Sequence, residues 1–196
     1  LRAITPARAG WPDRAHLALT VADAVSSGRH LRPLVAKLGY DPKLVTLTEL
    51  RIGSPGGTTV EGTGAFDRLT TTGKLTLTAA GAAGQLTDLL RPLAPDLVGR
   101  ITSPAGFEKD AASLKLALDV GPGKAPHQAR VRGVLDLAMP QISGTITVAA
   151  TSPAQAVRGA DLAALTPSEL KAHASLASPR GEALLDALDM PRIVAV

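Results

Sequence analysis

Several short segments of this chain alternate apolar side chains with threonines and charged residues. The clearest examples are residues 17–21, 73–78, 114–120 and 144–148. Successive side chains of a strand point to opposite faces, so this alternation predicts an antiparallel sheet with one apolar face. With less regular extended segments included, strands are predicted at 14–23, 44–52, 58–66, 69–80, 111–121, 128–137 and 141–150.

Helical signals are fewer and shorter. Leucines spaced three and four apart over 86–93 predict a short helix, which Pro92 limits. In the last third of the chain, the capping box Thr166-Pro-Ser-Glu169 and the pair Ser178-Pro179 predict the starts of two short helices. Residues 25–28 are expected to be a connection, 103–104 a short turn, and 192–196 a further strand at which the sequence stops.

These elements together predict an α+β fold. It has a curved antiparallel sheet of about seven strands, with short helices after each hairpin group. A weak internal repeat supports this arrangement, because residues 64–90 and 133–162 both follow the order strand, turn, strand, helix. We therefore expect one continuous sheet built from two parts, 1–101 and 102–196, forming an internal fragment of a longer repeated β-groove.

Composition narrows the function. The 196 residues carry a net charge of +4 without a run of five like charges, and they include only four aromatic rings. Nucleic-acid readers use basic stripes and stacking rings, so this class is disfavoured. The absence of cysteine excludes disulfides, thiol nucleophiles and cysteine zinc sites.

Enzymatic motifs also fail to match. Residues 61–67 have two glycines of a dinucleotide-binding loop but Asp67 in place of the third, and 121–124 lack the first glycine of a phosphate-binding loop. No Gly-x-Ser-x-Gly elbow occurs, and the four histidines are far apart in the sequence. We therefore expect no enzyme, no catalytic or metal site and no cofactor.

The order of elements resembles that of the AsmA-like family. The resemblance covers about residues 14–165 and is carried by Leu47–Ile52, Pro55–Gly64, Gly73–Ala80 and the leucine-rich helix at 86–90. Proteins of this family are bacterial envelope proteins, held in the inner membrane by an N-terminal helix and extending into the periplasm. Their long sheets are similar to those of bridge-like lipid-transfer proteins, whose apolar groove carries phospholipid acyl chains.

For this chain, the resemblance implies a periplasmic segment that handles phospholipid or supports outer-membrane assembly. The membrane attachment would lie in a segment outside the sequence given. The residues expected to contact acyl chains are the inward-facing ones of the predicted strands: Leu17, Leu19, Val21, Leu75, Leu77, Leu114, Leu116, Leu118, Val131, Ile146 and Val148.

Two alternatives are also consistent with the sequence. If the predicted helices cover the whole apolar face, the chain is a structural scaffold without a ligand. A small-molecule or glycan-binding β domain would instead need a polar cleft with stacking rings, which the shortage of aromatic residues disfavours.

Overall fold

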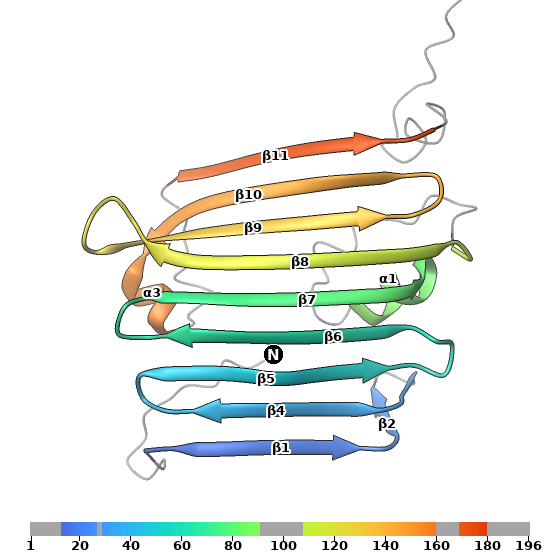
Figure 1. The fold of residues 1–196 in the computed structure, drawn as a ribbon, viewed down its shortest axis with the longest axis horizontal. Helices are drawn as coiled ribbons and strands as arrows, with labels where there is room; N and C mark the ends of the chain where they lie inside the picture. The colour runs from blue at the N-terminus through green and yellow to red at the C-terminus, as the bar shows by residue number, and fades with distance from the viewer. Residues whose placement is uncertain (1–12, 27–28, 91–107, 160–168, 180–196) are drawn as a thin grey trace, which may run out of the picture.

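Nine antiparallel strands form one large sheet in the computed structural model, which describes residues 13–26, 29–90, 108–159 and 169–179. Strands that follow one another in this sheet along the chain are also neighbours in space, in the order β1-β4-β5-β6-β7-β8-β9-β10-β11 (Figure 1). Their bounds are β1 Ala15–Val21, β4 Leu34–Tyr40, β5 Leu44–Gly53, β6 Thr59–Asp67, β7 Thr72–Ala82, β8 Ala111–Pro122, β9 Gln128–Ala138, β10 Ser143–Pro153 and β11 Glu169–Ala177.

A small hairpin separates β1 from its partner β4. It consists of β2 (Ala24–Ser26) and β3 (Arg29–Leu31), which pair only with each other among the described residues. Backbone hydrogen bonds fix the chain after the hairpin to the end of β5: the Arg32 N–H donates to the Gly53 carbonyl over 2.7 Å, and the Gly53 N–H donates to the Pro33 carbonyl over 2.9 Å. The insertion therefore leaves the order of the main sheet unchanged.

Among the described residues, two short helices lie at opposite ends of the sheet (Figure 1). Helix α1 (Ala83–Leu90) continues directly from β7 and contacts β7 and β8, whereas α3 (Ala154–Gly159) continues from β10 and contacts β9 and β10. The Arg158 side chain of α3 also donates a hydrogen bond to the hydroxyl of Thr71, in the turn before β7. Each helix thus packs against the strands at one end of the sheet.

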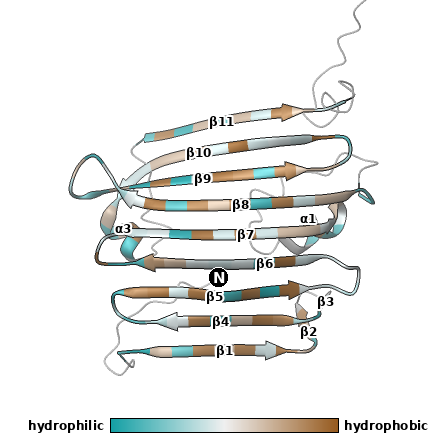
Figure 2. Cartoon of the chain, viewed as in Figure 1, coloured by the Kyte–Doolittle hydropathy of each residue, from teal (hydrophilic) through white to brown (hydrophobic). Residues whose placement is uncertain are grey.

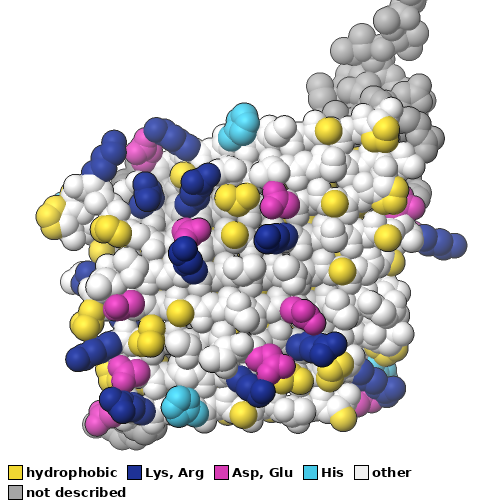
Figure 3. All heavy atoms as spheres, viewed as in Figure 1, with side chains coloured by type: hydrophobic (Ala, Val, Ile, Leu, Met, Phe, Trp, Pro, Cys, Tyr) yellow, Lys and Arg dark blue, Asp and Glu magenta, His cyan; other side chains and the backbone are white. Residues whose placement is uncertain are grey.

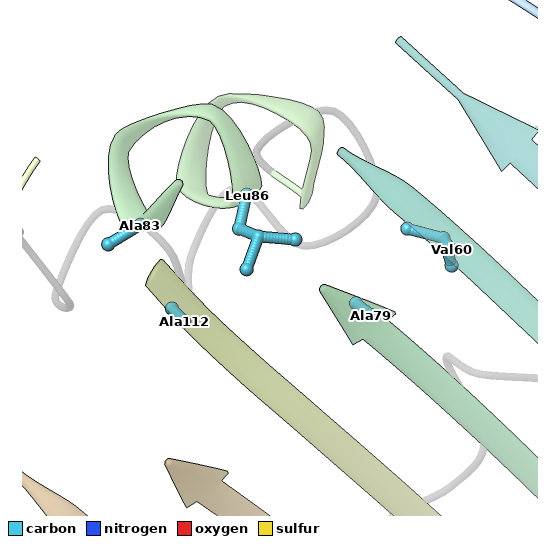
Figure 4. Packing of buried hydrophobic residues seen from close by; sticks show 5 residues of the cluster. All are labelled: Val60, Ala79, Ala83, Leu86 and Ala112. Carbon is cyan, nitrogen blue, oxygen red and sulfur yellow. The ribbon is translucent and has the colours of Figure 1, made fainter. Parts of the chain in front are cut away.

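A buried hydrophobic cluster lies under α1. Leu86 points from the helix towards the strands and contributes to a cluster with Val60, Ala79, Ala83 and Ala112 (Figure 4). Leu86 is only 2% exposed, and the remaining members are exposed by 8% or less. The cluster is small because most of its members are alanines, as expected for a chain with few aromatic residues.

The structure confirms the antiparallel sheet with few short helices, and each strand predicted within the described residues is present. The prediction of about seven strands is wrong, because the main sheet contains nine. The two main-sheet strands missed are β4 and β11, and Val25 and Ser26 of the predicted connection at 25–28 belong to strand β2. The curvature of the sheet, its internal repeat and the division at residue 101 stay predictions.

One helix prediction is contradicted directly. The capping box Thr166–Glu169 predicted a helix, but Glu169 begins strand β11, which pairs with β10 over nine residue pairs. Hydrogen bonding to a long neighbouring strand therefore outweighs the local helix signal. The other predicted helix after Pro179, the turn at 103–104 and the strand at 192–196 lie outside the described residues.

Candidate functional site

The strand register gathers apolar residues onto one side of the sheet. Directly opposite residues of an antiparallel pair point to the same face, so the register can be followed from strand to strand. One such row consists of Leu19, Ala36, Leu50, Gly62, Leu77, Leu116, Leu135, Ile146 and Ala174. The row beside it consists of Leu17, Leu38, Leu47, Gly64, Leu75, Leu118, Gly133, Val148 and Ala172.

Two more rows flank these on either side and have the same character. One runs from Val21 to Leu176, and the other from Ala15 to Leu170. None of the four rows contains a charged residue, and Tyr40 carries their only side-chain hydroxyl. We call the surface formed by these four rows the apolar face. Figure 2 shows the underlying alternation as hydrophobic bands that recur along each strand.

Every residue predicted to contact acyl chains lies on the apolar face. The register places Leu17, Leu19 and Val21 at the β1 edge, and the remaining eight on β7 to β10. The alternation along the chain does not predict the contribution of β4 to β6, which connects these two groups. The alternation of apolar and polar residues is interrupted within β5, and β6 has glycines at 62 and 64 in place of apolar side chains. Neither strand therefore shows a regular pattern that would predict an apolar face.

A β-bulge explains the irregular spacing in β5. Leu47 and Leu50 are three residues apart, yet both lie on the apolar face, because the register shifts between them. The extra residue leaves Glu49 on the opposite side, where its carboxylate forms an ion pair with Lys37 at 2.7 Å. The bulge thus keeps a charged side chain off the apolar face.

Glycines on the apolar face make room for leucines of neighbouring strands. A Cβ at Gly62 would lie 2.4 Å from Cδ2 of Leu77, and one at Gly144 would lie 2.5 Å from Cδ2 of Leu176. The same relation holds between Gly133 and Leu118, at 3.1 Å. These leucine side chains therefore lie across the glycines, so they project less from the sheet and the surface is smoother.

The opposite face of the sheet is polar and is the face seen in Figure 3, where basic and acidic side chains are interspersed. Cross-strand ion pairs join Arg51 to Glu61 at 3.5 Å and Lys74 to Asp119 at 3.8 Å. Such exposed pairs contribute little stability each, about 0–1 kcal/mol. Their effect is to give one side of the sheet a well-hydrated surface, in contrast with the other.

The described helices cover only the two ends of the apolar face. Val60 and Ala79 are buried under α1, and Ala129 and Ser152 are buried where α3 contacts β9 and β10. Between and beside these ends, the leucines are half-buried or exposed, with Leu17 at 57%, Leu19 at 41% and Leu38 at 38%. Within the described part of the chain, no helix lies over the middle rows.

The apolar face, including the parts that lie under α1 and α3, is large compared with the exposed apolar patches of typical monomers. With strands about 4.8 Å apart and rows about 6.8 Å apart, four rows across nine strands cover about 1,000 Å². The largest apolar patch of a typical monomer is about 300–600 Å². Covering half of the apolar face would remove about 500 Å² from water, a gross gain of about 12 kcal/mol.

A charged cluster lies at the base of the β2–β3 hairpin, away from these rows. The Asp23 carboxylate accepts hydrogen bonds from Arg32 and from His30, the latter over 2.9 Å. The Arg32 hydrogen bond, followed by that of His30, lowers the pKa of Asp23 to about 2. All three side chains are largely exposed, so the cluster orients the hairpin rather than forming an enclosed site.

A shallow depression of about 410 Å³ lies on the polar face. Its lining includes Glu61, Lys115 and Asp136, together with Leu114, Leu137 and smaller residues, and no aromatic ring. Within the described ranges, no group of three or more potential metal ligands occurs, and no helix is long and apolar enough to cross a membrane. The apolar face is therefore the most distinctive surface of the described chain.

Comparison of the chain with protein families, with curated proteins and with solved structures finds no match.

Proposed function

We propose that this chain is a non-enzymatic segment that holds phospholipid acyl chains on its apolar face. The observation that carries the proposal is the uninterrupted apolar surface of four rows across nine strands, of which the described helices cover only the two ends. A surface of this area favours an apolar partner, and lipid chains fit a face that offers neither charges nor hydrogen-bonding pockets.

The shape of the face suits an extended chain. The middle rows run across the strands for about 38 Å, which is eight strand spacings. Leu77 and Leu176 lie against Gly62 and Gly144, so the surface is smoother at these two positions. An acyl chain lying across the strands would contact leucine, isoleucine and valine side chains along its length, while a headgroup could remain in water.

In keeping with the resemblance to the AsmA-like family, we place this segment in a periplasmic protein that is attached to the inner membrane through a part outside this chain. Handling of phospholipid during outer-membrane assembly is the corresponding cellular role. The scaffold alternative differs in one respect: it requires the whole apolar face to be covered by protein.

A pair of lysine substitutions on β8 tests the proposal. Leu116 lies at the centre of the apolar face, and its neighbour Ala117 points to the polar face. We expect Leu116→Lys to abolish the phospholipid detected by mass spectrometry in solvent extracts of the purified chain. It should also slow transfer of a fluorescently labelled phospholipid between vesicles of phosphatidylethanolamine and phosphatidylglycerol by about tenfold, because the ammonium must be desolvated. Ala117→Lys should leave both unchanged.

Thermal stability distinguishes the scaffold from the lipid-binding sheet. On an open face, the Leu116→Lys ammonium remains in water and the melting temperature changes little. In a covered core the same substitution is severely destabilising, by several kcal/mol. Lipid-free extracts of the native chain, combined with a large loss of stability in Leu116→Lys but not in Ala117→Lys, would favour the scaffold and refute the lipid proposal.

A further inference from the structure

Strand β1 forms one edge of the main sheet. Among the described residues it pairs with β4 alone, through seven residue pairs from Ala15–Tyr40 to Val21–Leu34. One row of its backbone N–H and C=O groups therefore faces away from the sheet. An edge of this kind is a template for pairing with another strand.

Proteins usually protect such edges with lysine, proline, inward-pointing charges or bulges. The seven residues of β1 include none of these, and His16 is the only ionisable side chain among them. The opposite edge differs, because β11 carries Lys171 and Glu169, which form an ion pair at 2.9 Å. Of the two edges, β1 is therefore the one without charged side chains that would disfavour pairing with another strand.

The sequence of β1 is complementary to itself in antiparallel pairing. When Ala18 lies on a two-fold axis, Leu17 of each copy lies opposite Leu19 of the other, and Ala15 lies opposite Val21. On the polar side, His16 lies opposite Thr20, and Ala18 opposite itself. This register pairs all seven residues and keeps the apolar face of both copies on the same side.

Charges and exposure agree with this register. Along the chain, the nearest charged side chains are Arg14 and Asp23, which lie outside the paired run and are bonded within their own chain to Asp41 and Arg32. Across the sheet, Lys37 of β4 lies opposite Ala18 and forms an ion pair with Glu49 of its own chain. Leu17 and Leu19, exposed by 57% and 41%, are the side chains that the second copy would cover. No pair of like charges comes together within the seven residues.

We propose that two copies of this chain associate through antiparallel pairing of their β1 strands, centred on Ala18. The two main sheets then join into one, and their apolar faces become continuous. A two-fold arrangement is closed, so association stops at the dimer. The proposal does not depend on lipid binding, because it needs only the exposed backbone and side chains of β1.

Disulfide trapping tests the register directly, since the chain has no cysteine of its own. Directly opposite Cα atoms are about 4.5–5.5 Å apart, within disulfide range. We therefore expect Ala18→Cys to cross-link the dimer at least about tenfold faster than the matched variant Thr20→Cys. In the proposed register, two copies of residue 20 are offset by four residues, about 14 Å. Both positions are exposed on the polar face of β1, and circular dichroism would confirm that both variants fold.

Sedimentation equilibrium of the lipid-free native chain should show a concentration-dependent dimer. Leu17→Lys should raise its dissociation constant by about tenfold or more through the loss of two Leu17–Leu19 contacts. Leu170→Lys, an equally exposed leucine at the β11 edge, should not change it. A monomer at all concentrations, equal cross-linking at residues 18 and 20, or a dimer weakened by Leu170→Lys instead of Leu17→Lys would overturn the proposal.

Discussion

Truncating Leu86 tests whether α1 closes its end of the apolar face as the structure shows. The side chain is 2% exposed and lies at the centre of the buried cluster. Leu86→Ala removes about three methylene-sized groups, worth about 2.4 kcal/mol in transfer free energy. The cavity left under a short helix adds to this, so we expect a total loss of about 3 kcal/mol. Leu69→Ala is the control, because Leu69 is 63% exposed in a turn.

Urea denaturation followed by far-UV circular dichroism measures the free energy of unfolding of both variants. We expect a change below about 0.5 kcal/mol for Leu69→Ala. Hydrogen exchange of the α1 amides then shows whether Leu86→Ala weakens the whole sheet or only the attachment of the helix. A loss below about 1 kcal/mol, with α1 amides as protected as in the native chain, would refute the packing described here.

Two further predictions concern backbone space and pH. Gly62→Val should destabilise the chain by about 1–3 kcal/mol in urea denaturation, because the valine side chain would overlap Leu77. The control Gly121→Ala, with no atom near its Cβ, should change the free energy of unfolding by less than about 0.5 kcal/mol. Equal effects of the two substitutions would contradict the packing. The pKa of Asp23 is lowered to about 2, so its contribution to hairpin stability is present above the ordinary value near 3.8 and is lost as the pH falls towards 2. A carboxyl NMR titration should give a midpoint near 2, and Arg32→Gln should move it upwards; an unchanged midpoint in that variant would contradict the assignment of Arg32 as the main cause.

Much of the sheet could be predicted because alternation survives where one face is apolar and the other hydrated. The positions of Leu114, Leu116 and Leu118 on one face could be predicted in this way, since they follow a strict period of two. Strand β4 was missed because its polar side includes Val35 and Gly39, which removes the contrast between its faces.

Strand β11 was missed for a different reason. Its leucines and alanines do alternate with polar residues, but alanine favours helices and the preceding capping box strengthened that interpretation. Only the pairing with β10 decides the outcome, and such long-range contacts are not visible in local sequence. The bulge at Glu49 was unpredictable for the same reason, because a register shift is a property of two strands.

The meander order of the main sheet has a consequence for how such a protein can change in size. Each main-sheet strand bonds to those next to it along the chain, so no segment has to pass over another to reach its place. Adding or deleting one hairpin would leave all remaining ladders intact and would widen or narrow the apolar face by two strand spacings, about 10 Å. The reach of that surface is therefore set by how many hairpins the gene encodes.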